Sequence, residues 1–263
     1  MEINKDNYYS KEIDRHYFSV SQYKSFLKCE AATMAKLNRD YEEPKSDALL
    51  FGSYVHSWLD DTQDQFKEEN PILFSTRGAT KGQMKAEYKL ADEMIKVLKL
   101  DPFVMMALQG EKEIIMTGDL FGAPWKIRMD VYNPRNGRFA DLKTVKGIYE
   151  KYWREDIGYC SFVEAYGYIT QMAVYTEIES QNRGGDWLEN FIVAVSKQDP
   201  PDKAVITVDH TSLNIELEDV QKNMERFIAV KSGVEKPDSC GTCHYCRRNK
   251  MLNTVLDYRE LIG

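Results

Sequence analysis

The sequence has 263 residues, of which 43% are hydrophobic and 29% are charged, and a formal net charge of −7 at pH 7. These values are typical of a globular protein with a sizeable core, and the acidic balance argues against a protein that coats nucleic acid non-specifically. No apolar run approaches the roughly 20 residues of a membrane span, and the first residues lack the apolar core of a signal peptide. We therefore expect no membrane partner and a cytoplasmic location.

The first 110 residues read as the helical N-terminal part of a single domain. Ser19 and Gln22 have the spacing of a capping box. Apolar residues then recur at helical intervals as far as Leu37, which predicts one helix that contains Cys29.

A second helix is expected to begin near Ser46 or Asp47. Within it Gly52 and His56 are four residues apart and share a face, so the small glycine leaves room beside the imidazole. A lone histidine on an apolar helix is usually a hydrogen-bonded core residue, and a ligand role depends on the motifs further along the chain. After a loop, a third helix is predicted by a core stripe at helical spacing: Met84, Tyr88, Ala91, Ile95 and Leu98.

The stretch from Glu111 to Thr144 predicts a three-stranded antiparallel meander. Gly, Pro and Asn separate short apolar or alternating runs, which is the usual sequence pattern of hairpin-linked strands. The three runs are 111–117, 124–131 and 138–144, with turns at Gly118-Asp119 and at 133–137.

Charged side chains converge on the third strand of this meander. Asp141 and Lys143 are two residues apart, so both leave the same face of the strand. Asp130 lies near the end of the second strand, and the hairpin can bring it beside Asp141. Burying two carboxylates and an ammonium on one face is costly unless a divalent cation or an anionic ligand compensates them. An isolated Asp-x-Lys is more often a solvated surface pair, so the rest of the chain must decide between the two.

A helix is expected from about Ser161 to Glu179, with Gln171 and Tyr175 one turn apart on a neighbouring, more polar face. Two strands follow at 191–195 and 204–208, and then a last helix from about Ser212 to Lys231.

This order of elements predicts an α/β fold with a mixed central sheet flanked by helices. The sheet comprises the three-strand meander plus two further strands. Residues 111–210 would form the sheet core, and residues 211–263 a C-terminal helix with a Cys-rich tail.

Three of the five cysteines lie close together near the end of the sequence. Cys240, Cys243 and Cys246 have the spacing C-x₂-C-x₂-C, at which three thiolates can converge on one metal ion or cluster. Cys29 could be a fourth ligand that the fold brings in. His244 keeps a zinc site open, and three reduced thiols in a turn are an equal alternative. Disulfides are the least expected outcome in a cytosolic chain.

Taken together, the motifs resemble the PD-(D/E)xK nuclease superfamily in its RecB-like branch. Asp130 and Asp141-Leu142-Lys143 match the carboxylates and the lysine of its core. Gly52 to His56 matches its G-x-x-x-H motif, and Gln171 to Tyr175 matches its Q-x-x-x-Y motif, in the right order. The opening and the Cys-rich end are similar to phage and prophage exonucleases of the RecE type. The resemblance covers nearly the whole chain.

The resemblance implies a metal-dependent phosphodiesterase. Asp130 and Asp141 would hold Mg²⁺ or Mn²⁺ through hard carboxylate oxygens. His56 and the backbone carbonyl of Leu142 would complete the coordination. Glu113 is a further carboxylate candidate on the first strand, and its alternative is a solvated charge.

The other motif residues would act around the metal. Lys143 would orient or deprotonate the attacking water or stabilise the developing charge, Gln171 would position Lys143 or the phosphate, and Tyr175 would support the strand. Some RecB-like nucleases hold a four-iron four-sulfur cluster with one upstream and three downstream cysteines, although the downstream spacing here is tighter. The matching positions are Cys29, Cys240, Cys243 and Cys246.

The RecE-type likeness implies processive 5′-to-3′ digestion of linear duplex DNA. It would leave 3′ single strands for an annealing protein of the RecT type in phage recombination, and the subunits would form a ring-shaped homo-oligomer in the bacterial host. One alternative is a RecB-like nuclease that acts on single strands or in CRISPR adaptation. A second is a non-catalytic DNA-binding protein on a nuclease fold, against which the full Asp-Asp-Lys set argues.

Overall fold

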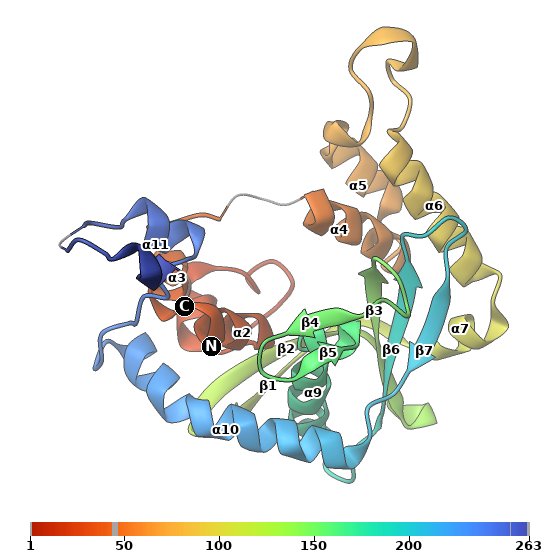
Figure 1. The fold of residues 1–263 in the computed structure, drawn as a ribbon. Coiled ribbons are helices and arrows are strands. Elements are labelled where there is room, and N and C mark those ends of the chain that lie inside the picture. Colours follow the sequence, from red (N-terminus) through yellow and green to blue (C-terminus); the bar gives the residue numbers. More distant parts are fainter. Residues whose placement is uncertain (1, 44–46, 253, 262–263) are drawn as a thin grey trace.

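A five-stranded mixed sheet forms the centre of the molecule (Figure 1). The computed structural model describes residues 2–43, 47–252 and 254–261. The strands lie in the order β1-β2-β3-β6-β7, with β3 and β6 parallel and the other neighbours antiparallel. Their bounds are β1 (Glu111–Leu120), β2 (Ala123–Asn133), β3 (Arg138–Val145), β6 (Glu189–Ser196) and β7 (Lys203–Ile206). The predicted α/β fold with a meander and two further strands is confirmed.

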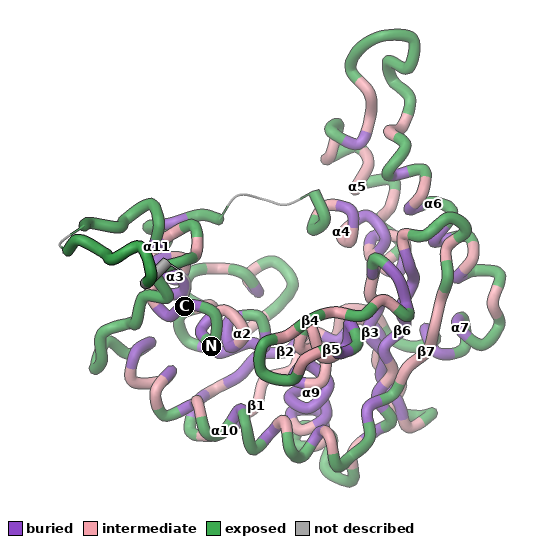
Figure 2. The backbone as a smooth tube through the Cα atoms, viewed as in Figure 1, coloured by how far each residue is buried: buried purple, intermediate pink, exposed green. Residues whose placement is uncertain are grey.

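Helices cover both faces of this sheet. One layer contains α9 (Tyr168–Arg183) and α10 (His210–Ser232), and the other contains α4 (Asp47–Leu59) and α6 (Ala86–Lys99). The inner strands β2, β3 and β6 are largely buried, whereas the edge strands β1 and β7 are mostly half-buried (Figure 2). Within the described parts of the chain, no helix is both long and apolar enough to cross a membrane.

Side chains along β3 alternate between the two layers. Phe139 packs into the core under α9, whereas Ala140 and Leu142 pack into the core under α4. Because the period of a strand is two, Asp141 and Lys143 share the face of Phe139 and point toward α9. The strand therefore presents its charged residues to the helix that carries Gln171.

The first hairpin turns later than predicted. Gly118 lies inside β1 opposite Trp125, and the chain reverses at Phe121-Gly122, where φ is 52° and 81°. Positive φ at both central residues is what a tight two-residue hairpin requires. The turn predicted at Gly118-Asp119 is wrong because Gly118 serves packing: a Cβ there would lie 2.6 Å from Gln181 Oε1 of α9.

The helix predicted from Ser19 to Leu37 is in fact two helices. They are α2 (Val20–Lys28) and α3 (Glu30–Asn38), and Cys29 between them is extended, with φ −171° and ψ 108°. The apolar spacing continues across the break because both helices bury one face, so periodicity alone did not reveal it. Cys29 ends one helix and caps the next instead of lying inside a helix.

The helix predicted from Ser161 to Glu179 is also divided. It consists of α8 (Phe162–Ala165) and α9, and Gly167 between them has a φ of 62°. A Cβ on Gly167 would lie 2.9 Å from Lys24 Cδ, so the glycine lets α2 approach closely. The second helix begins at Asp47, while Ser46 lies outside the described residues.

Several short elements join the main ones. These are α1 (Lys11–His16), α5 (Gln63–Glu69), α7 (Pro102–Ala107), β4 (Tyr152–Arg154), β5 (Gly158–Cys160) and α11 (His244–Arg248). β4 and β5 form a separate two-stranded hairpin.

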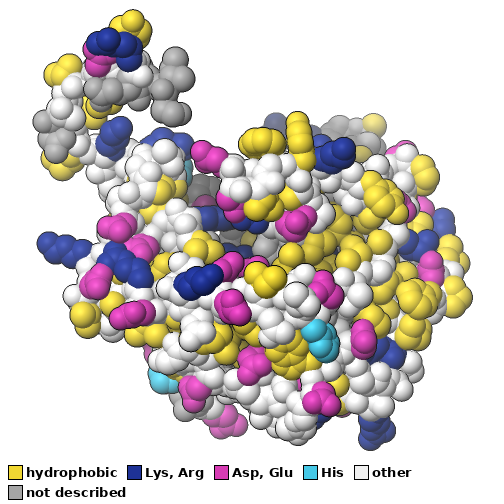
Figure 3. All heavy atoms as spheres, turned by 60° about the horizontal axis from the view of Figure 1, so that its bottom comes forward, with side chains coloured by type: hydrophobic (Ala, Val, Ile, Leu, Met, Phe, Trp, Pro, Cys, Tyr) yellow, Lys and Arg dark blue, Asp and Glu magenta, His cyan; other side chains and the backbone are white. Residues whose placement is uncertain are grey.

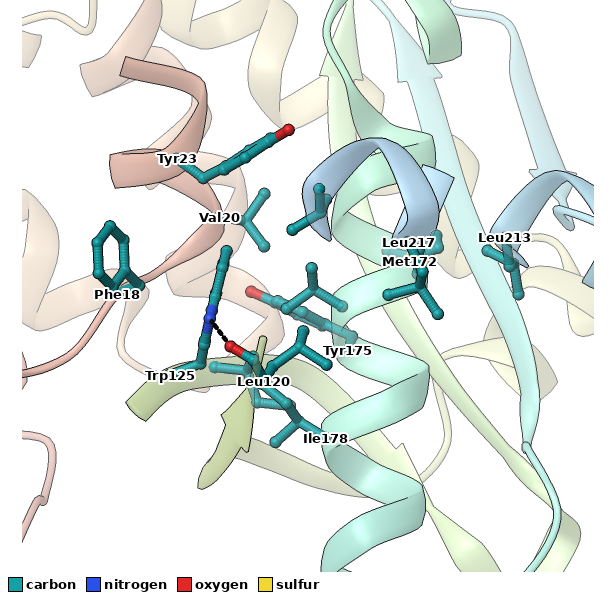
Figure 4. Packing of buried hydrophobic residues seen from close by; sticks show 14 of the residues in the cluster. Phe18, Val20, Tyr23, Leu120, Trp125, Met172, Tyr175, Ile178, Leu213 and Leu217 are labelled. Carbon is teal, nitrogen blue, oxygen red and sulfur yellow. Dashed lines mark hydrogen bonds between the residues drawn. The ribbon is translucent and has the colours of Figure 1, made fainter. Parts of the chain in front are cut away.

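The N-terminal segment completes the sheet beside β2. The Phe18 N–H donates to the Pro124 carbonyl, and the Lys126 N–H donates to the Phe18 carbonyl, both at 2.8 Å. Trp125 is fully buried beside Phe18, and its indole N–H donates to the Leu120 carbonyl at 3.1 Å (Figure 4). This indole therefore joins the N-terminal segment to the sheet.

We expect Trp125→Ala to lower the free energy of unfolding by about 3–5 kcal/mol, because it leaves a large cavity in the core. Trp153→Ala is a matched control: Trp153 is 68% exposed, so its loss should change stability by no more than about 0.5 kcal/mol. Urea unfolding followed by circular dichroism measures both. Similar losses in the two variants would contradict this description of the core.

Candidate active site

The candidate site lies where β2 and β3 part. The two strands pair from Asn133–Arg138 to Val131–Ala140, and the next pair in this register would be Asp130 with Asp141. Instead, Asp130 Oδ2 accepts a hydrogen bond from the Leu142 N–H at 2.8 Å. The carboxylate thus accepts the hydrogen bond of a backbone N–H that has no partner from strand pairing, because β2 and β3 no longer pair at this point.

Asp141 is almost completely buried in this gap, with 2% of its surface exposed. Gln171 Nε2 donates to Oδ1, and Lys143 Nζ contacts Oδ2. The ion pair with Lys143 is the contact that the structure shows for Oδ2. Burial and the nearby charge of Asp130 raise the pKa of Asp141, and Lys143 opposes them. A buried carboxylate beside a second carboxylate fits a divalent cation, which takes oxygen ligands of this kind.

Lys143 is held as a cation. Burial lowers its pKa, but attraction by Asp141 and Asp130 outweighs burial and raises the pKa overall. Its ammonium also lies 4.8 Å from the centroid of the Tyr168 ring. A lysine that holds its proton this firmly is better suited to stabilising negative charge than to accepting a proton.

His56 reaches the gap from the opposite layer. Its Nδ1 lies 3.5 Å from Asp130 Oδ2, and the side chain is partly exposed. Gly52, one turn earlier on α4, faces β3, because a Cβ at this position would lie 3.6 Å from Thr144 Oγ1. This turn of α4 therefore packs next to β3, where a Cβ at position 52 would make an ordinary van der Waals contact.

Glu113 lies opposite Asp130 but is bound by two cations. Its carboxylate contacts Lys5 at 3.0 Å and Arg128 at 3.4 Å. Its φ of 53° is rare for a residue with a side chain, and such strain gathers at functional sites. A ligand role for Glu113 remains a prediction, as does one for the Leu142 carbonyl.

Gln171 and Tyr175 anchor α9 to two strands. Gln171 binds Asp141 of β3, and the Tyr175 hydroxyl donates to the Arg128 carbonyl of β2 at 3.0 Å. The helix therefore spans the gap and fixes its width. The structure brings together the six residues of the predicted motifs: His56, Asp130, Asp141, Lys143, Gln171 and Tyr175.

Asp60 is a site residue that the sequence reasoning missed. Burial and the charges of Glu113 and Asp130 raise its pKa from 3.8 to about 6. In the sequence, the only indication that Asp60 belongs to the site is its position four residues, or one helical turn, after His56.

Lys24 was also missed. Its ammonium donates to the Tyr166 carbonyl at 3.0 Å and lies 5.6 Å from the Tyr168 ring centroid. Burial and repulsion by Lys143 lower its pKa to about 8. No local pattern marks this residue, because its partners lie more than 100 residues away.

The four predicted cysteines form a second site. The sulfurs of Cys29, Cys240, Cys243 and Cys246 all lie within 4.8 Å of one another. The distance from Cys246 Sγ is 3.5 Å to Cys29 Sγ and 3.9 Å to Cys240 Sγ. Such a group can hold a metal.

Backbone N–H groups point at three of these sulfurs. They belong to Ala32, Cys243 and Cys246, and donate to Cys29, Cys240 and Cys243 at 3.3–3.5 Å. Such donors favour the thiolate, the form that binds metals. His244 turns away to Tyr41, with Nδ1 3.0 Å from the tyrosine hydroxyl.

Comparisons with known proteins agree with this geometry. Residues 19–249 match the family model of a PDDEXK-like domain of unknown function (DUF3799). A crystal structure named "putative exonuclease" from Eubacterium rectale is 42% identical, with a TM-score of 0.93 over 100% of this chain and 99% of that chain. The structure of SSO0001 is 13% identical over 86% of this chain and 91% of that chain, and it superposes poorly, with a TM-score of 0.29. No curated protein matches the chain.

We expect Asp60→Asn to stabilise the metal-free protein at pH 8. Because the folded state raises the pKa of Asp60 to about 6, this group lowers stability as the pH rises from about 4 to 6, and the full cost remains above pH 6. Asp60 is only partly buried, so the gain should be about 1 kcal/mol, or roughly 2–4 °C in Tm.

Thermal unfolding with EDTA at pH 4.5 and pH 8 measures this effect, and the gain at the lower pH should be about a third of that at pH 8. Asp61→Asn, at the neighbouring position, is the matched control and should change neither value. A lower Tm for Asp60→Asn at pH 8 would show that the carboxylate stabilises the site instead.

Proposed function

Because the chain belongs to the PDDEXK-like domain family, we propose that it is a nuclease that depends on a divalent metal. The main support for this proposal is that Asp141 is buried beside a second carboxylate, Asp130, and beside a lysine that keeps its charge. This set of groups suits phosphodiester hydrolysis, in which charge on phosphate oxygens must be compensated. Figure 3 shows a hollow on one face of the molecule with both basic and acidic side chains around it, although the whole chain is acidic.

Each residue around the gap has its own role in the proposed hydrolysis. Asp130, Asp141 and His56 would hold Mg²⁺ or Mn²⁺, which supplies an activated water and neutralises phosphate charge. Lys143 directs its fixed positive charge at the developing negative charge of the phosphate. Gln171 holds Asp141 in place, so the carboxylate cannot rotate away from the gap.

The finer assignment is an exodeoxyribonuclease that digests linear duplex DNA in the 5′-to-3′ direction. It is supported by the RecE-type likeness of the sequence and by the name of the 42% identical relative. From that likeness we also propose a ring-shaped homo-oligomer and an annealing protein that receives the 3′ single strand in phage recombination.

We expect wild-type protein with Mg²⁺ to degrade linear duplex DNA and to spare closed circles. Lys143→Met should lose at least about 100-fold in rate, because it removes the charge that stabilises the transition state. Lys146→Met is the matched control, since Lys146 is exposed and pairs with Glu150. Gel assays with a 5′-end label measure rate and polarity together.

Several results would contradict the proposal. Equal loss of circles would exclude an end requirement, and activity in EDTA would exclude the metal. Early release of a 3′ label would reverse the polarity. Digestion of single strands but not of duplex ends would favour the RecB-like alternative.

For the cysteines, we propose one tetrahedral zinc ion. Four thiolates at about 2.3 Å from a shared ion lie about 3.8 Å apart, close to the observed separations of 3.5 Å and 3.9 Å. In a four-iron cluster each thiolate binds a different iron, which requires wider spacing. The ion would join the α2–α3 junction to the C-terminal tail.

We expect about one zinc per chain by elemental analysis and no visible absorbance of an iron–sulfur cluster. Cys29→Ser should lose the zinc and lower the Tm, because metal binding at such sites stabilises the folded state. Cys160→Ser, outside this group, should keep the metal. Protein that carries iron and acid-labile sulfide after anaerobic preparation would establish the cluster instead.

A further inference from the structure

A second lysine lies beside Lys143 in the candidate site. The ammoniums of Lys143 and Lys24 both lie against the ring of Tyr168, at 4.8 Å and 5.6 Å from its centroid. These two distances limit the separation of the ammoniums to at most about 10 Å. Lys143 comes from β3 and Lys24 from α2, so the sheet and an N-terminal helix contribute one cation each.

Lys24 lacks the carboxylate partner that Lys143 has. Lys143 forms an ion pair with Asp141, whereas among the described residues no carboxylate lies within 4.0 Å of the Lys24 ammonium. That ammonium donates to the Tyr166 carbonyl at 3.0 Å. Because an ammonium has three donors, this single carbonyl leaves it able to bind further acceptors. Its pKa of about 8 keeps it mostly charged at pH 7.

The local fold fixes Lys24 in this position. Gly167, between α8 and α9, has a φ of 62°, which is unfavourable for a residue with a Cβ. A Cβ there would lie 2.9 Å from Lys24 Cδ, so the glycine leaves space for the lysine side chain. The neighbouring Tyr166 carbonyl then binds the ammonium. Lys24 is therefore a positioned charge next to the site and not a freely moving surface lysine.

An anion is the ligand that fits this pair of cations. The ammoniums of Lys24 and Lys143 repel each other, and burial removes part of their hydration. A ligand with negatively charged oxygens would reduce both costs. Asp141 supplies such oxygens to Lys143, so Lys24 is the cation that still requires them.

In the proposed nuclease this anion is a phosphate of DNA. Phosphates of one strand follow each other at about 3.4 Å along the helix axis. A strand whose scissile phosphate lies at Lys143 therefore brings its next phosphate within the range that separates the two ammoniums.

We propose that Lys24 forms a second phosphate subsite, which binds the phosphate next to the scissile one on the strand that is cut. This inference rests on the proposed nuclease function. Lys24 would act on position: by binding the neighbouring phosphate it sets the register in which the scissile phosphate meets Lys143. Because the contact is to the backbone, it is independent of base sequence.

The test neutralises one phosphate at a time in the DNA. The probe is a linear duplex in which one uncharged methylphosphonate replaces a phosphate near the bond that is cleaved first in Mg²⁺. Binding to the full-length protein is measured with Ca²⁺ in place of Mg²⁺, to avoid rapid cleavage. For wild type, a methylphosphonate next to the cleaved bond should weaken binding. Lys24→Met should bind unmodified duplex about tenfold more weakly at 50 mM salt, and that methylphosphonate should weaken it no further.

Salt dependence and kinetics give two further measurements. Lys24→Met should lower the slope of the logarithm of affinity against the logarithm of salt concentration by about 0.9, the value of one phosphate contact. In Mg²⁺ it should raise KM and leave kcat within about threefold, because Lys143 and the carboxylates are unchanged.

Two variants control for folding and for charge. Lys28→Met removes an exposed lysine one turn further along α2, beside Cys29, and should bind as wild type. Lys24→Arg keeps the positive charge and should keep the salt slope. The Tm of each variant shows whether it is folded under the conditions of the assay.

The outcomes distinguish this inference from the proposed function. If wild type cleaves linear DNA but tolerates a methylphosphonate next to the cleaved bond, the second subsite is wrong, whatever the variants do, and the nuclease stands. If Lys24→Met lowers kcat at an unchanged KM and keeps the salt slope, Lys24 only supports the structure around Lys143, and the subsite is again wrong. If wild type neither binds nor cleaves DNA, both proposals fail.

Discussion

The site depends on the parting of two neighbouring strands. β2 and β3 pair only from Asn133–Arg138 to Val131–Ala140, and the backbone N–H of Leu142 then needs a new acceptor. The Asp130 carboxylate is that acceptor, so its position is fixed by the backbone instead of by a flexible rotamer. Because α9 binds β3 through Gln171 and β2 through Tyr175, the gap keeps its width.

The same parting explains why distant segments meet around the site. Where β3 leaves, Phe18 pairs with β2 in its place and brings α2 after it. That placement sets Lys24 beside Tyr168 and puts Cys29 at the helix break next to the C-terminal cysteines. The first and last parts of the chain therefore meet beside β3 because the pairing of β2 changes from β3 to Phe18.

The sequence predicted what short-range periodicity encodes. The alternation on β3 and the four-residue spacing on α4 and α9 placed the motif residues on the correct faces. Contacts between distant segments produce no local sequence pattern, so the sequence did not predict that Lys24 lies beside Tyr166. Two glycines were interpreted wrongly from the sequence. Gly118 suggested a turn, but it lies inside β1 and makes room for α9. Gly167 separates α8 from α9, and the apolar spacing that continues across it gave no sign of the break.

The charges of the site also indicate what it can bind. Burial is the largest cause of the raised pKa values of Asp60 and Asp141, and repulsion by neighbouring carboxylates adds to it. A divalent cation would offset both costs, because it supplies positive charge and coordinates carboxylate oxygens that burial has removed from water. In the proposed nuclease, the phosphodiester backbone would then meet a site whose negative charge the metal has already compensated.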